Sequence, residues 1–417
     1  MKSPKIFQPV HSFYSMSWIA VIFILTYACD KTNLMTDDKN LIDSIEGEAI
    51  QKTSQDLYQA TSEEYKNNNF AISPLSIQLA LYMVYNGAEG ETQTEIGKLL
   101  RVANLDMDTL NTKVQSLMKY FNNLISKGHL DIHNALFYDE SRVELAENYV
   151  DKLKKYFDAY QSDLNFGDPS AVASINEWVQ DKTYDKIKEV IQTISDQEVL
   201  FLINALYLKA DWVNGFLAET TADRPFFTME GREISIPTMH RTMGVEQLTK
   251  DGYQIARLPL ADSALFVYLI MPQQSSQLSS AIQSDVVGGI WNNSLEFQNT
   301  RVMFEMPVIE TKTHVTLNDA LQSLGMVSAF NPQQAELGNI GQAQNGLPLH
   351  ISRTLHDVYL KMDEKGVEGA AVTTIGVGTT SLPPSLQFNK PFLYLIVDQE
   401  LGLPLFIGQF TGVDAKN

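Results

Sequence analysis

The sequence predicts an α+β fold, because helical patterns fill the first half of the chain and strand patterns fill the second. Apolar residues recur at helical spacing up to about residue 192, whereas runs rich in β-branched and aromatic residues follow from residue 196. The two kinds of segment do not alternate regularly, which argues against a doubly wound parallel sheet. With 417 residues, of which 44% are hydrophobic, the chain can bury a large core.

The N-terminus has the features of an export signal. Lys2 and Lys5 precede an apolar run over residues 18–28, which is short for a membrane-spanning helix. Cys29 follows directly and is the single cysteine, so no internal disulfide can form. We therefore assign residues 1–28 to a signal peptide, the polar residues 29–41 to a flexible tether, and residues 42–417 to one folded domain.

Cys29 resembles the lipidation site of bacterial lipoproteins, in which signal cleavage exposes the thiol for acylation. That family usually has leucine three residues before the cysteine, whereas this chain has Thr26 there and Leu25 one residue earlier. A plain secretory signal with an incidental cysteine is the alternative. The protein is thus expected to be exported, and either lipid-anchored in a bacterial cell envelope or on the cell surface, or secreted.

Several helices are expected between residues 42 and 192. The first runs from Ile42 to about Lys66, and the second begins with Ser73 as N-cap, followed by Pro74 in the first turn. Further helices are expected at about residues 92–101, 107–126, 144–157 and 170–192.

A buried sheet is expected in the second half of the chain. From Val199 to Leu208 every residue is apolar except Asn204, so this strand should be central and covered on both faces. Other strands are expected at residues 265–272, 301–312, 391–398 and 404–410.

Composition and motifs argue against several classes of function. The net charge of −19 provides no broad positive field, so no nucleic-acid partner is expected. The chain contains no common catalytic or phosphate-binding motif and no second cysteine for a metal pair. His129 and His133 are four residues apart without an evident third ligand, and we interpret them as a surface pair. The sequence therefore predicts no enzyme, no cofactor and no metal site.

The segment 364–384 has an unusual composition. It contains no charge after Glu368 and no aromatic residue. Read with a period of two, the face that begins at Val367 is apolar or small throughout, which is typical of a strand with one buried side. Its glycines and two closing prolines are typical of a loop. From these residues alone, a segment that can adopt both states and an ordinary strand with a Gly-rich turn remain equally open.

Five motifs, in order and at matching spacing, resemble landmarks of the serpin family. The resemblance covers about Ile42 to Val413 and implies eight or nine helices, mostly in the N-terminal half, around three β-sheets. It also implies a monomer with an exposed reactive loop over residues 364–384. The motifs are NFAISPLSIQLALYMVYNGAEGETQTEI, INEWVQDKTYDKI, LINALYLKADW, HISRTLHDVYLKMDEKGVEGAA and FNKPFLYLIVD.

The resemblance also implies roles for particular residues. The cleaved bond of the family falls between Thr380 and Ser381, and Trp212 matches the tryptophan where the loop enters the sheet, the breach. Ser73, Ser76, Asn204 and His356 match the polar cluster beneath the central strands, the shutter. His356 is therefore expected to be a hydrogen-bonded core residue and not a catalyst. The hinge of the reactive loop falls on Glu364, Lys365, Gly366, Val367, Glu368, Gly369, Ala370, Ala371 and Val372.

The implied mechanism is suicide inhibition of serine proteases. A protease attacks the carbonyl of Thr380, and the loop inserts into the central sheet before water releases the acyl-enzyme. Val367, Val372 and Val308 depart from the usual residues of the family, so the rate of insertion could be altered. Non-inhibitory members that act as carriers, chaperones or surface binding proteins are the alternative.

Thr380 indicates the class of target. It is small, uncharged and β-branched, which suits the shallow pocket of elastase-like proteases first and subtilisin-like proteases second. No lysine or arginine lies between Gly366 and Asn389, so trypsin-like proteases are expected to be poor targets. Because neighbouring residues of the loop are similar, cleavage one to three residues upstream is an alternative.

Overall fold

The computed structural model describes residues 47–124, 129–261, 263–367 and 383–414. The predicted signal peptide, tether and Cys29 lie outside these ranges. So do hinge residues Glu368 to Val372 and the bond between Thr380 and Ser381.

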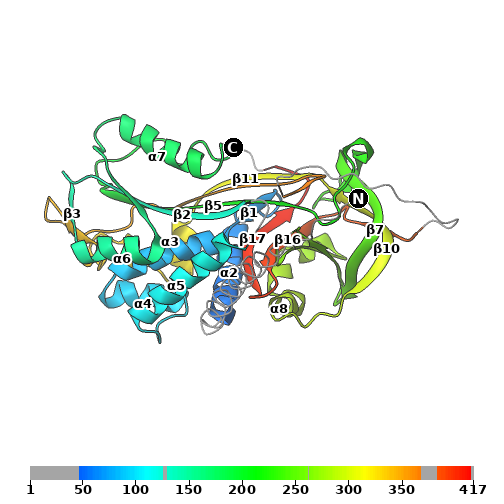
Figure 1. The fold of residues 1–417 in the computed structure, drawn as a ribbon, viewed down its shortest axis with the longest axis horizontal. Coiled ribbons are helices and arrows are strands. Elements are labelled where there is room, and N and C mark those ends of the chain that lie inside the picture. The colour runs from blue at the N-terminus through cyan, green and yellow to red at the C-terminus, as the bar shows by residue number, and fades with distance from the viewer. Residues whose placement is uncertain (1–46, 125–128, 262, 368–382, 415–417) are drawn as a thin grey trace, which may run out of the picture.

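A six-stranded sheet forms the long upper layer of the molecule in Figure 1. Neighbouring strands are antiparallel, except for the parallel pair of β2 with β4. In spatial order the strands are β11 (Ile309–Thr316), β13 (Leu355–Met362), β14 (Gly366–Val367), β5 (Leu200–Asp211), β2 (His129–Tyr138) and β4 (Tyr160–Asp163).

A nine-stranded sheet and a two-stranded sheet complete the three sheets seen in the described residues, in agreement with the expected fold. Strand β6 (Ala222–Phe227) pairs with β7 beside the main path, and β3 (Val143–Leu145) pairs with β12 (Gly341–Ala343). The main path runs through β1 (Phe70–Ile72), β17 (Leu403–Phe410), β16 (Phe392–Asp398), β9 (Leu265–Pro272), β8 (Tyr253–Pro259), β7 (Glu233–Lys250), β10 (Gln298–Pro307) and β15 (Ser385–Gln387).

Eight α-helices are present in the described part of the chain. Figure 1 shows α7 alone on one face of the six-stranded sheet and α3, α5 and α6 on the other, where α3 also contacts β17. The helices are α2 (Gly47–Ser62), α3 (Pro74–Gly87), α4 (Gly90–Leu99), α5 (Met107–Asn122), α6 (Glu147–Phe157), α7 (Ser170–Lys182), α8 (Asp285–Trp291) and α9 (Asn318–Ser323).

Helix α3 begins as its sequence predicts. The side chain of Ser73 is the N-cap and accepts a hydrogen bond from the backbone N–H of Ser76, while Pro74 occupies the first turn. Most residues of α3 are buried, because the helix lies between the six-stranded sheet and β17. The cap therefore fixes the start of a helix that supports both large sheets.

Three predicted elements were wrong in extent. The helix expected over residues 170–192 ends at Lys182, where Tyr184 and Asp185 turn the chain with positive φ. The first helix ends at Ser62 and not near Lys66. The strand expected over residues 301–312 is two strands, β10 and β11, which separate at Val308 and join different sheets.

Strand β5 is central, as predicted, but its burial was predicted wrongly. Residues 200–204 are only partly buried, whereas burial was expected on both faces. The reason is that this half of β5, which pairs with β2 on one side, borders a cavity on the side that faces β13. His133 also differs from the expected surface position, because its ring on β2 is half-buried.

Candidate functional site

The six-stranded sheet is interrupted between β5 and β13. At one end, β14 lies between them: Gly366 pairs with Asp211, and Val367 pairs with both Ala210 and Met362. Below these pairs, no ladder in the described residues joins β5 to β13 directly. Two facing strand edges without a partner form a template for one more strand.

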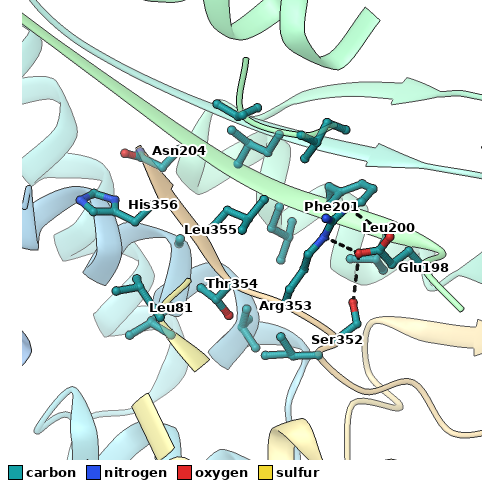
Figure 2. A pocket seen from close by; sticks show the side chains of 18 of the residues that line it. Leu81, Glu198, Leu200, Phe201, Asn204, Ser352, Arg353, Thr354, Leu355 and His356 are labelled. Atoms are coloured by element: carbon teal, nitrogen blue, oxygen red, sulfur yellow. Dashed lines mark hydrogen bonds and ion pairs between the residues drawn. The ribbon is translucent and has the colours of Figure 1, made fainter. Parts of the chain in front are cut away.

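A cavity of about 160 Å3 lies in this interruption, and we call it the slot. Figure 2 shows its lining side chains between the ribbon of β5 and that of β13. The walls are mostly apolar, with polar groups at one end and near the middle. Apolar lining residues include Leu202 and Leu206 of β5, Leu355 of β13, and Ile77, Leu81 and Val84 of α3.

The described part of the predicted hinge is held at the end of the slot where β14 lies, which we call its upper end. Trp212, the predicted breach residue, donates from Nε1 to the carbonyl of Asp363 at 2.8 Å and from its backbone N–H to that of Lys365 at 2.9 Å. The carboxylate of Glu364 accepts a hydrogen bond from Thr221 Oγ1 at 2.6 Å. These contacts bring the hinge and the breach together and fix where the chain turns away from β13.

Gly366 is required by the close approach of β14 to β5. A Cβ at this position would lie 2.2 Å from the carbonyl oxygen of Ala210 and 2.6 Å from the Cα of Asp211. Backbone atoms cannot move aside as a flexible side chain can, so only glycine fits.

Val367 follows Gly366 and is 1% exposed. Its side chain therefore already occupies the buried face that the period-two pattern assigned to it. Inhibitory members of the family usually have threonine or serine at this position, and its hydroxyl would have to find a partner in this apolar environment, whereas valine needs none.

The four predicted shutter residues lie together beside the slot. The backbone N–H of Ser73 donates to Nε2 of His356 at 3.0 Å, and the hydroxyl of Ser76 donates to Oδ1 of Asn204. Because the Ser73 hydroxyl caps the N–H of Ser76, the two contacts are connected through the start of α3. The cluster thus links α3 to β5 and to β13, the two strands that border the slot.

Asn134 extends this cluster and was missed by the sequence reasoning. Its Oδ1 accepts a hydrogen bond from Asn204 Nδ2 at 2.8 Å, and its own Nδ2 donates to the carbonyl of Phe157 at 2.8 Å. Asn134 and Asn204 are direct partners in the β2–β5 ladder. A lone amide in the middle of the strand sequence HLDIHNALFY was the available signal.

His356 is neutral in this environment. The ring is 6% exposed, and burial lowers its pKa to about 3. Its Nε2 must be unprotonated to accept the hydrogen bond from Ser73, which places the ring proton on Nδ1. A buried, neutral acceptor is the environment expected for a core histidine.

No group of three His, Cys, Asp or Glu side chains able to hold a metal ion occurs in the described residues. Within the same residues, no helix is long and apolar enough to cross a membrane. Cys29 and the bond between Thr380 and Ser381 fall outside them.

Comparison with known proteins identifies the family. Residues 48–413 match the family described as Serpin (serine protease inhibitor). The chain is a serpin. The description is of a protease inhibitor and not of an enzyme, in agreement with the predicted class.

Similar proteins span nearly the whole serpin domain. Serpin A3-6 of Bos taurus is 28% identical over 396 residues, covering 92% of this chain and 93% of that protein. Native tengpin, a thermophilic serpin, has a TM-score of 0.79 at 26% identity, covering 88% and 93% of the two chains. Latent tengpin gives 0.73 at 25% identity, covering 88% and 98%. Thyroxine-binding globulin in complex with thyroxine gives 0.78 at 24%, covering 89% and 100%, which shows a shared fold alone.

Proposed function

We propose that this serpin is a suicide inhibitor of serine proteases that traps the acyl-enzyme by inserting its cleaved loop into the slot. The observation that carries the proposal is β14: Gly366 and Val367 already lie between β5 and β13, and an apolar slot continues below them. An inserted loop would complete the interrupted sheet.

The proposed reaction begins at Thr380. The protease serine attacks the carbonyl carbon of Thr380, the peptide bond to Ser381 breaks, and the amine of Ser381 leaves as a new N-terminus. The loop then extends β14 before water hydrolyses the ester, and it carries the attached protease along the sheet. Gly369, Ala370 and Ala371 are small, which lets the hinge pass between the strands.

The register of β14 supports the path. Position 373 lies seven residues beyond Gly366 and therefore falls opposite Asn204, seven residues before Asp211. It also lies six residues beyond Val367 and falls opposite His356, six residues before Met362. Both ladders thus carry the proposed strand through the shutter at its middle. Each backbone hydrogen bond gained there contributes about 0.5–1.5 kcal/mol.

The proposed targets follow from the bond between Thr380 and Ser381. Elastase-like proteases fit best, subtilisin-like proteases second, and trypsin-like proteases poorly. Incubation with pancreatic elastase should give an SDS-stable complex and a released C-terminal fragment that begins at Ser381. A stable complex with trypsin would show that the bait bond is misplaced, and the absence of any complex would contradict the inhibitory function.

A non-inhibitory carrier, chaperone or surface binding protein is the second candidate. Val367 in place of threonine or serine and the fold shared with thyroxine-binding globulin favour it. The small residues after the hinge argue against it. Cleavage by elastase without a stable complex would support this candidate.

For location, we propose export by the signal peptide and lipid anchoring in a bacterial cell envelope through Cys29, with plain secretion as the alternative. Stable anchoring requires more than one acyl chain. The wild type should incorporate labelled palmitate and partition into detergent, while Cys29→Ser should do neither. A soluble, unlabelled wild type would leave secretion.

A further inference from the structure

The lower end of the slot, which is the end far from β14, is closed by an ion pair. Glu198 lies two residues before β5, and Arg353 lies two residues before β13. Arg353 Nε lies 2.6 Å from Glu198 Oε1, and Nη2 donates to Oε2 at 3.2 Å. Figure 2 shows the Arg353 side chain reaching toward Glu198. We call these two residues the clamp.

The clamp is held by its surroundings. The Glu198 side chain is only 4% exposed, and its carboxylate also accepts hydrogen bonds from the backbone N–H of Ser195 at 2.7 Å and from Ser352 Oγ at 3.4 Å. Arg142 Nη1 donates to the carbonyl oxygens of Ser195 and Glu198, each at 3.1 Å. A buried carboxylate of this kind is stable only while it is paired.

The clamp spans the slot between β5 and β13. The guanidinium carbon of Arg353 lies 5.6 Å from the ring centroid of Phe201 on β5. Continuing the two ladders of β14 places Arg353 and Phe201 opposite position 376, which is ten residues beyond Gly366 and nine beyond Val367. Because its side chain reaches from the β13 side to Glu198 on the β5 side, Arg353 crosses the space that an added strand would need at this level.

Glu198 marks the end of the path. It lies thirteen residues before Asp211, and the residue thirteen beyond Gly366 is Thr379. An added strand would meet Arg353 at position 376 and Glu198 at position 379, directly before the proposed bait residue Thr380. The ion pair can persist through the first steps of insertion and has to open for the last.

We propose that Glu198 and Arg353 control the completion of strand insertion, as positioning residues that hold the lower ends of β5 and β13 together. This inference rests on the proposed function, because it requires that the slot accepts a strand. The clamp should slow a strand that reaches position 376 or beyond and should not affect a shorter one.

Two synthetic peptides separate these cases. Fluorescent peptides with the sequences of residues 368–375 and 368–379 are incubated with the purified full chain, whose own Val367 already occupies the preceding position, and incorporation is followed by fluorescence anisotropy. Glu198→Gln should incorporate the long peptide about threefold to tenfold faster than the wild type, the factor expected for the loss of one partly buried ion pair. The short peptide should enter both proteins at the same rate.

A matched ion pair in the other large sheet provides the control. Arg257 Nε lies 2.7 Å from Glu246 Oε2, with no part in the slot. Glu246→Gln should therefore change neither rate. If Glu198→Gln does not fold, Arg353→Lys, which keeps the charge but loses the planar fork, should still accelerate the long peptide by a smaller factor.

The outcomes are distinguishable. Incorporation of both peptides with no change in the ratio of their rates in either clamp variant would overturn the role of the clamp and leave insertion intact. Failure of both peptides to enter the wild type would overturn insertion, and the clamp with it. Acceleration of both peptides alike would also overturn the inference, because it would show general loosening of the sheet.

Discussion

The two large sheets of this serpin differ in how completely they are paired. In the nine-stranded sheet, β16 pairs along its length with β17 and β9, and every residue of β16 and β17 is buried. In the six-stranded sheet, the described residues join β5 to β13 through the two residues of β14 alone, and a cavity lies between the two strands beyond them. One sheet is paired along its central strands, whereas the other has two facing strand edges and a cavity at its centre.

This difference separates the part of the molecule that provides stability from the part that can change conformation. Residues of β16 and β17 form a continuous packed core, so moving any part of it would raise the free energy of the folded state. The slot instead leaves apolar side chains and strand edges partly unsatisfied, so its filling can release free energy. Because the nine-stranded sheet stays unchanged while the six-stranded sheet opens, the single domain can remain folded during the proposed insertion.

The largest effect is expected where a charge would be forced into the slot. Ala371→Arg should convert the inhibitor to a substrate, with cleavage after Thr380 but no stable complex. An unpaired arginine on the inward face costs several kcal/mol, about enough to stop insertion. Gel analysis after incubation with elastase measures this, with Ala371→Ser as a control that should still form the complex. Normal complex formation by Ala371→Arg would contradict the insertion path.

Truncation of leucines should distinguish the complete sheet from the interrupted one. Leu395 of β16 is fully buried, so Leu395→Ala should lower the free energy of unfolding by about 2–5 kcal/mol. Leu202 of β5 borders the slot and is partly buried, so Leu202→Ala should cost clearly less, about 1 kcal/mol. Urea unfolding of both variants gives the comparison. Equal losses would mean that the two sheets are packed alike.

Substitution of Gly366 should weaken the connection between β5 and β13. The added Cβ of Gly366→Ala collides with the Ala210 carbonyl, so we expect a loss of about 2–4 kcal/mol and easier proteolysis near the hinge. Gly288 in α8 has open space around its Cβ position, and Gly288→Ala should leave stability unchanged or raised by up to about 1 kcal/mol. Similar thermal stability of the two variants would contradict the close approach of β14.

A smaller effect is expected from pH acting on the shutter. The pKa of His356 is about 3 in the folded protein, below its value of about 6.5 in the unfolded chain. As the pH falls, the unfolded chain therefore binds a proton before the folded protein does. The contribution of His356 to stability is fully present above about pH 6.5 and is lost as the pH decreases toward 3. At pH 5 the loss should be about 2 kcal/mol. His356→Gln should remove this part of the pH dependence in urea unfolding, and an unchanged pH profile would exclude the assignment.

Local sequence patterns predicted those elements whose formation depends on neighbouring residues. Ser73 and Pro74 identify the start of α3, the apolar run of residues 265–272 matches β9, and alternation identifies the buried face at Val367. The match of motifs to the serpin family then implied the hinge and the shutter, since a single sequence contains no information on which distant residues meet.

Features that depend on contacts between distant residues could not be predicted from local patterns. The apolar pattern around Val308 is continuous, so the division into β10 and β11 became visible only because the two strands join different sheets. Partial burial of β5 results from the cavity on its β13 side, where the described residues contain no joining ladder, and the residues of β5 themselves do not encode this. Glu198 and Arg353 are 155 residues apart and meet only because β5 and β13 flank the slot. Such contacts depend on the packing of whole sheets, which acts beyond the reach of local periodicity.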